Sequence, residues 1–299
     1  MTEVINGATY RRHALLLGFL NKAEVDAIFA QNPIRVADGR TPAQAAQEAR
    51  AGRTALGAYA VGVHAPLPTG LAAPADEVRH RPLFVNEYEA KGDFEFASVP
   101  ISSLLVPQMN IDLEYVRELS ENVALAPDDA RDFAFAFPRS DIAEPIVKGN
   151  TVVFTAAAPN ISIKPIPTVR RTADGFDIVV EAKARPNYVM IARLGGRMIL
   201  QNGVHKVLAL RAKGRLHTFA VVHEVQRLEE LGLPHANLSM FTEPNYLAAP
   251  RPPLVEDLAS PASVEVLTRA TSNVYRVVIQ AEEIVAPALS LREVPRGGG

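Results

Sequence analysis

The chain has 299 residues, of which 48% are hydrophobic, and a formal net charge of −2 with a sequence pI near 6.4. This charge balance gives no overall attraction to nucleic acid or to an anionic surface, so neither nucleic acid nor a membrane is expected as a partner. The absence of cysteine excludes disulfides, thiolate metal sites and cysteine nucleophiles, and it is typical of a cytoplasmic protein.

Residues 1–65 are predicted to form a helical arm. Thr9–Gln31 has apolar residues at spacings typical of one or two helices, and Asn21 followed by Glu24 matches a capping box at the start of the second. Thr41–Pro42 marks the start of another helix, because threonine is a good N-cap and proline suits the first helical position.

A linker is predicted at residues 66–82, which are rich in proline. The main domain follows at residues 83–232, with strands between Leu83 and Val106 and a helix over Asp112–Asn122. Residues 233–299 are predicted to be an extended wrapping segment with two further strands and a flexible tail that ends in three glycines.

An insertion is expected at residues 125–185 of this domain. Asp174-Gly175 predicts a hairpin turn between two strands, whereas Phe133–Phe137 fits a helix or a strand. Thr151–Ala157 and Ile161–Ile166 form either a hairpin or two separate strands. The predicted strand pairs are Thr168–Arg171 with Phe176–Ala182, and Asn187–Arg193 with Arg197–Gln201.

The second hairpin leads into a strand, turn, helix and strand over residues 196–222. Asn202-Gly203 predicts the tight turn, because both residue types tolerate positive φ. Apolar residues at helical spacing predict a helix over Val204–Lys213, and Leu216–Val222 is typical of a strand that enters a core. Val222–Leu231 is predicted to be a charged helix.

His205 and Lys206 fall in the first turn of this predicted helix. The N-terminus of a helix presents free N–H groups and a partial positive charge, so a cation there is unfavourable to the helix itself. Such a cation is either tolerated as a structural residue or used to hold an anion such as phosphate.

The segment Asn202–Leu210, NGVHKVLAL, resembles the phosphate-binding box of the ParB/sulfiredoxin-like superfamily. Val99–Val123 is similar to that family's opening strand, proline-containing loop and helix. Lys206 stands where the family usually has arginine, which replaces a bidentate phosphate contact with a point charge. The lack of cysteine excludes sulfiredoxin chemistry. The expected fold is α+β, a mixed β-sheet core of ParB/sulfiredoxin-like type with the N-terminal helical arm.

The resemblance implies a nucleotide, CTP or ATP, with or without magnesium. Its phosphates would be held at residues 198–212. Asp112 is either a ribose contact or an ordinary helix-start carboxylate, and Arg197 is either a phosphate contact or a solvated residue. The residues predicted to bind nucleotide are Asn202, Gly203, His205, Lys206, Asp112 and Arg197.

The leading prediction is therefore a cytoplasmic nucleotide-binding protein. The alternative is a structural or scaffold protein that acts through protein–protein contacts, as a homo-oligomer or with another protein, and keeps a degenerate nucleotide site. A DNA-associated regulator or nuclease of the same superfamily fits the charge balance poorly. No residue is assigned to catalysis, so enzymatic activity is left open. The spacing of His217 and His223 matches no known metal motif, and no metal is predicted.

Overall fold

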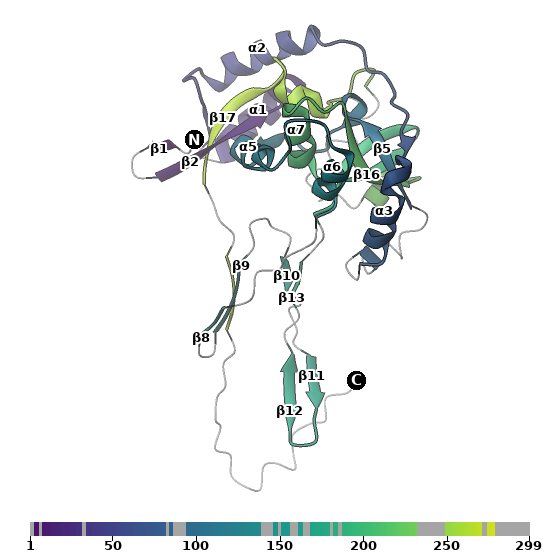
Figure 1. Ribbon diagram of the computed structural model, residues 1–299. Helices are drawn as coiled ribbons and strands as arrows, with labels where there is room; N and C mark the ends of the chain where they lie inside the picture. Colours follow the sequence, from purple (N-terminus) through teal and green to yellow (C-terminus); the bar gives the residue numbers. More distant parts are fainter. Residues whose placement is uncertain are drawn as a thin grey trace.

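A computed structural model describes most of the chain between Glu3 and Val278 (Figure 1). The described residues are 3–5, 8–31, 34–81, 84–85, 94–138, 146–148, 151–155, 161–163, 168–179, 182–184, 187–231, 249–270 and 274–278. They form two β-sheets with packed helices and a set of β-ribbons that extend from this body. The expected α+β class with a mixed sheet is confirmed.

The first sheet joins the two ends of the described chain. Its strands run in the order β1-β2-β17-β3, and β7 also pairs with β2. All these pairings are antiparallel. The strands are β1 (Glu3–Ile5), β2 (Ala8–Leu15), β3 (Arg35–Val36), β7 (Asn110–Asp112) and β17 (Val264–Arg269).

The prediction of helix from Thr9 onward is wrong for its first part, because residues 8–15 form strand β2. Pairing with β17 on one side and with β1 and β7 on the other outweighs the helical spacing of the apolar residues. The second predicted helix is confirmed as α1 (Lys22–Gln31). Its capping box is present: Glu24 N–H donates to Asn21 Oδ1, and Asn21 N–H donates to Glu24 Oε2.

The second sheet is mixed, with the order β4-β5-β16-β14-β15-β6. β14 runs parallel to β16 and β15 runs parallel to β6, whereas the other neighbours are antiparallel. The hairpin predicted at residues 187–201 is confirmed as β14 and β15, with positive φ at both turn glycines. The strands are β4 (Ala65–Pro66), β5 (Phe94–Pro100), β6 (Leu104–Leu105), β14 (Met190–Leu194), β15 (Arg197–Asn202) and β16 (His217–Glu224).

Helices α5, α6 and α7 pack beside the sheets, and α2 covers the opposite end of the body (Figure 1). The helix predicted at Thr41–Pro42 is confirmed as α2, with Thr41 and Gln44 forming a reciprocal cap. Phe133–Phe137, left open by the sequence, is mainly helical. The helices are α2 (Pro42–Thr54), α3 (Ala72–Arg79), α5 (Leu113–Glu121), α6 (Asp129–Ala136) and α7 (Val204–Ala212).

Two predicted segments differ from the structure. The linker at 66–82 contains the 3₁₀ turn η2 (Thr69–Leu71) and helix α3, because Leu71, Ala75 and Val78 are buried against the core. The charged helix predicted at Val222–Leu231 is instead the end of β16 followed by the 3₁₀ turn η5 (Leu228–Leu231). The backbone of β16 pairs with β5 and β14 as far as His223 and Glu224, which prevents a helix from starting at residue 222.

The β-ribbons extend away from the body (Figure 1). The hairpin predicted around Asp174-Gly175 is confirmed as β11 with β12. The strands predicted near residues 151 and 161 do not pair with each other: β9 pairs with β8 and β18, and β10 pairs with β13. The ribbon strands are β8 (Ile146–Lys148), β9 (Thr151–Thr155), β10 (Ile161–Ile163), β11 (Thr168–Arg171), β12 (Phe176–Val179), β13 (Ala182–Ala184) and β18 (Val274–Val278).

One large apolar cluster runs through the body, from Ala14 in β2 to Val266 in β17. It includes residues on both sides of the boundary predicted at 66–82. Within the part of the chain that the structure describes, no helix combines the length and apolar character needed to cross a membrane. The predicted wrapping segment lies outside the described residues at 232–248, and so does the glycine tail.

Candidate functional site

The turn between β15 and α7 is the structural centre of the predicted nucleotide box. Gly203 has a φ of +90°, which favours glycine, and it is the N-cap residue of α7. A Cβ atom at this position would lie 3.0 Å from the Cα atom of Val189. The close approach that requires glycine is therefore an approach of the protein's own chain. Asn202, the last residue of β15, is half-buried beside this turn.

Lys206 is directed into the protein. Its side chain is buried, with 4% of the residue exposed. The Nζ atom donates to the Asn187 carbonyl at 2.5 Å and to the Ala136 carbonyl at 3.5 Å, and it lies 5.8 Å from the centre of the Phe135 ring. Burial lowers the pKa of Lys206 to about 7, because the charged form loses its water. In this arrangement the Lys206 amine is a hydrogen-bond donor to main-chain carbonyls.

His205 points to a different neighbourhood from Lys206. Its ring meets Tyr115 edge-on, with centroids 5.2 Å apart. The Nε2 atom is buried and has no hydrogen-bond partner among the described residues. Burial lowers the pKa of His205 to about 4, and the charge of Asp112 opposes this shift in part. The imidazole is therefore neutral near pH 7.

Asp112 lies close to His205 and has two structural contacts of its own. It is the N-cap of α5, where its Oδ1 atom accepts from Tyr115 N–H at 3.0 Å. Its Oδ2 atom is 3.0 Å from Nε of Arg11, and Nη2 of Arg11 lies 3.2 Å from Glu118. The resemblance placed the Asp112 carboxylate at a ribose. Within the chain it instead caps helix α5 and pairs with Arg11.

Arg197 lies at the opposite end of β15 from the turn. Both of its terminal nitrogens donate to the Ala249 carbonyl at 3.3 Å, and its guanidinium lies 5.5 Å from the centre of the Tyr59 ring. Five steps along a strand separate Arg197 from Asn202, or roughly 16 Å. The structure brings Asp112 and His205 together, but it does not bring Lys206 or Arg197 to them. These side chains as placed do not fit a shared triphosphate site.

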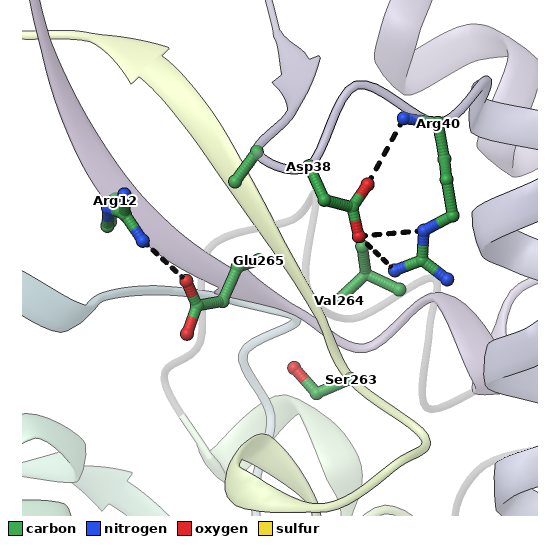
Figure 2. Close-up of a pocket in the computed structure, with 7 residues that line it drawn as sticks. Arg12, Asp38, Arg40, Ser263, Val264 and Glu265 are labelled. Carbon is green, nitrogen blue, oxygen red and sulfur yellow. Dashed lines mark hydrogen bonds and ion pairs between the residues drawn. The ribbon is translucent and has the colours of Figure 1, made fainter. Parts of the chain in front are cut away.

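A shallow depression of about 270 Å³ lies at the first sheet (Figure 2). Arg12 pairs with Glu265 across β2 and β17 at 3.2 Å, and Arg40 pairs with Asp38. Each arginine in the wall thus already has a carboxylate partner. No sequence motif predicts this depression, because its lining comes from three distant segments.

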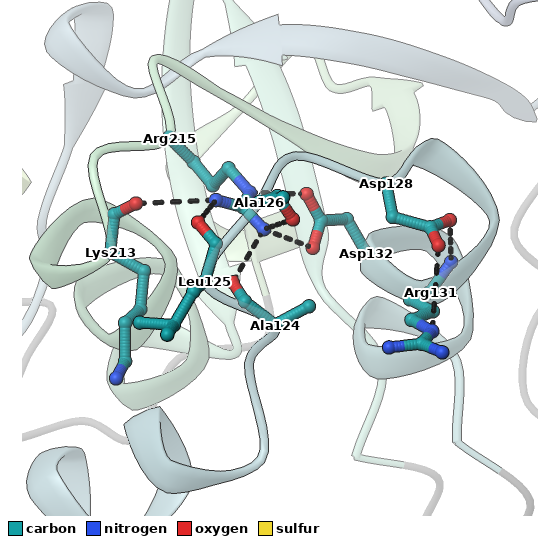
Figure 3. Close-up of polar contacts among 8 residues, drawn as sticks. All are labelled: Ala124, Leu125, Ala126, Asp128, Arg131, Asp132, Lys213 and Arg215. Carbon is teal, nitrogen blue, oxygen red and sulfur yellow. Dashed lines mark hydrogen bonds and ion pairs between the residues drawn. The ribbon is translucent and has the colours of Figure 1, made fainter.

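Arg215 is a buried residue with several polar contacts, and no sequence pattern predicts its role (Figure 3). Its Nε atom lies 2.6 Å from Asp132 of α6, and Nη2 donates at 2.8 Å to the carbonyls of both Ala124 and Ala126. Further bonds reach the carbonyls of Leu125 and Lys213. Arg215 thereby ties the loop between α5 and α6 to the end of α7. A lone arginine after a helix-ending glycine carries no sequence signal for such a role.

No protein-family model matches this chain, and neither a curated protein nor a solved structure matches it. The ParB/sulfiredoxin-like resemblance therefore stays a prediction. The described residues contain no group of three or more His, Asp or Glu side chains placed to hold a metal ion.

Proposed function

We propose that this chain is an assembly protein that works through protein–protein contacts made by its β-ribbons, with a second copy of the chain as the partner. The observation that carries the proposal is the ribbon of β11 and β12. Its backbone pairs only within the ribbon over the residues that the structure describes. Val169 is 62% exposed, and the turn residues are exposed as well.

An isolated two-stranded ribbon is marginally stable in water, because it cannot bury an apolar face. Its open edges are also a ready template for pairing with another chain. A partner that covers Val169 would supply the missing burial. The ribbon exposes charges of both signs, Arg170 and Arg171 on β11 and Asp174 and Asp177 toward β12, so two copies can be complementary to each other.

The placement of Lys206 supports this proposal over nucleotide binding. A phosphate-binding turn needs an approachable backbone and an available cation. Here Val189 packs against Gly203, and the Lys206 amine donates hydrogen bonds to main-chain carbonyls. The box is then a structural element of the fold, as the scaffold alternative expects.

The test is the molar mass of the full chain measured by size-exclusion chromatography with light scattering. We expect a defined oligomer that Val169→Asp dissociates. Val63→Asp is the matched control, because Val63 is 81% exposed but lies in the segment before β4. A wild-type monomer at all concentrations, or equal masses for wild type and Val169→Asp, would contradict the proposal.

Nucleotide binding is a second candidate, favoured by one observation. The unpartnered Nε2 atom of His205 is the polar group near the start of α7 that a ligand could engage. The measurement is the melting temperature with CTP or ATP and magnesium. At ligand ~100-fold above its dissociation constant, binding would add ~2.7 kcal/mol of stability. The shift should be lost in His205→Ala. A melting temperature that no nucleotide changes would leave assembly as the function.

A further inference from the structure

The ribbons between α6 and β14 leave and re-enter the body at two adjacent points. The outgoing root is Ala136–Pro138 at the end of α6, and the returning root is Asn187–Val189 before β14. Val189 N–H donates to the Ala136 carbonyl at 3.2 Å, and the rings of Phe137 and Tyr188 meet edge-on at 5.6 Å. The ribbon segment, defined as strands β8 to β13, therefore departs from and returns to the body at one place.

Lys206 makes contact with both roots from a third element. From α7, its Nζ atom donates to the Asn187 carbonyl of the returning root and to the Ala136 carbonyl of the outgoing root. The carbonyls at the end of a helix lack partners within the helix, and Ala136 is the last residue of α6. A buried carbonyl left without a donor is costly. Lys206 supplies the donor to the Asn187 carbonyl, and it makes a second, longer bond to the Ala136 carbonyl, which also accepts from Val189 N–H.

A second cation, Arg81, also donates hydrogen bonds to the outgoing root. Nη1 of Arg81 donates to the Phe137 carbonyl at 2.9 Å and to the Pro138 carbonyl at 3.2 Å. Arg81 is half-buried at the end of α3. Three consecutive carbonyls where the chain leaves the body are thus bonded to the side chains of Lys206 and Arg81, so the root is held by side chains as well as by the Val189 N–H bond.

We propose that Lys206 is a buried latch that ties both roots of the ribbon segment to α7, so that the ribbon segment separates from the body only when this latch opens. The proposal goes beyond assembly, since the latch operates whether or not the ribbons meet a partner. It also assigns a role to the residue that the box would give to phosphate. A latch of this kind sets how freely the ribbons move while the two sheets stay intact.

Hydrogen exchange measured by mass spectrometry on the full chain tests the latch. Lys206→Met keeps the length of the side chain but removes the donor. We expect exchange at residues 187–191 and in peptides from β8 to β13 to rise at least tenfold, with α2 and β17 unchanged. The control is Lys213→Met at the end of the same helix, whose ammonium points away from Arg215 (Figure 3). Unchanged exchange, or an equal rise in α2 and β17, would overturn the proposal.

A second measurement uses the wild-type protein, in case Lys206→Met does not fold. Acetic anhydride labels lysine amines only when they reach solvent. If the latch opens as a local event, the free energy of opening calculated from Lys206 acetylation will match that calculated from exchange of the Val189 amide, and both will lie well below the free energy of global unfolding. Acetylation of Lys206 only at the rate of global unfolding would show that no separate latch exists.

Discussion

Two buried cations lie near the two ends of α7, and their environments differ. Lys206 at the N-terminal end is 4% exposed, and among the described residues it contacts neutral carbonyls and an aromatic ring. Arg215 beyond the C-terminal end is 6% exposed and faces Asp132 at 2.6 Å as well as four carbonyls. Carbonyls satisfy donors, whereas a carboxylate also compensates charge. Lys206 can therefore lose its proton near neutral pH, whereas Arg215 depends on the Asp132 carboxylate to compensate its charge.

The largest effect should come from breaking the Arg215 pair. Arg215→Leu leaves the Asp132 carboxylate buried without its counter-charge, and we expect a loss of about 3–5 kcal/mol in the free energy of unfolding, measured with urea. Arg131→Leu on the same helix is the control, because its pair with Asp128 is exposed and contributes less than about 1 kcal/mol. Equal losses in the two variants would show that burial of the pair does not matter.

The next effect should be a rise in stability with pH caused by Lys206. Its folded pKa is lowered to about 7 from the model-peptide value of 10.5, so between these values the unfolded chain binds a proton that the folded chain does not. Stability then rises with pH through this window by up to ~1.4 kcal/mol per unit. Between pH 7 and pH 9 the free energy of unfolding, measured with denaturant, should rise by roughly 2–3 kcal/mol more in wild type than in Lys206→Met. Parallel pH profiles for the two proteins would rule this out.

His205 should give a smaller effect on the acid side. Its folded pKa is lowered from 6.5 to about 4, so the unfolded chain takes up a proton first as the pH falls. Stability contributed by neutral His205 is present above pH 6.5 and is lost progressively toward pH 4. Between pH 6.5 and pH 5 we expect a loss of about 2 kcal/mol that His205→Phe removes. A pH profile of His205→Phe that shows the same loss as wild type would contradict this assignment.

The smallest effect should come from Gly203→Ala, which tests how tightly the N-terminal end of α7 is closed. Positive φ costs a non-glycine residue about 1–2 kcal/mol, and the contact with Val189 at 3.0 Å adds to this cost. Gly195→Ala is matched in the sign of φ but has open space around it. Thermal unfolding should show Gly203→Ala to be less stable than Gly195→Ala. The reverse order would mean that the turn is open enough to admit a ligand.

Much of the local structure could be predicted where the signal is contained in a few neighbouring residues. The capping boxes at Asn21 and Thr41, the hairpin at Asp174-Gly175 and the turn at Gly203 all formed as expected. The caps depend on side-chain bonds within four residues, the turn at Gly203 on a positive φ, and the hairpin on a main-chain bond from Thr172 N–H to the Gly175 carbonyl. The strand at residues 8–15 could not be found in this way, because two of its three partners lie about 100 and 250 residues further along the chain.

The candidate site was harder to predict than the turn that contains it. The sequence places His205 and Lys206 side by side, but consecutive residues on a helix point about 100° apart. His205 therefore faces Tyr115 and Asp112, while Lys206 reaches Asn187 and Ala136. Which of two neighbouring side chains turns inward is decided by the elements that pack on α7. That packing involves segments such as 136–138 and 187–189, whose proximity no short motif encodes.

The position of β17 has a consequence for synthesis on the ribosome. This strand lies between β2 and β3, so the N-terminal sheet takes a central strand from residues 264–269. During synthesis β2 must therefore keep the edge that pairs with β17 unpaired until residues 264–269 have left the ribosome. Products that terminate early would lack β17 altogether. Such chains present the unpaired edge of β2 beside apolar residues. They are therefore expected to bind chaperones and to aggregate.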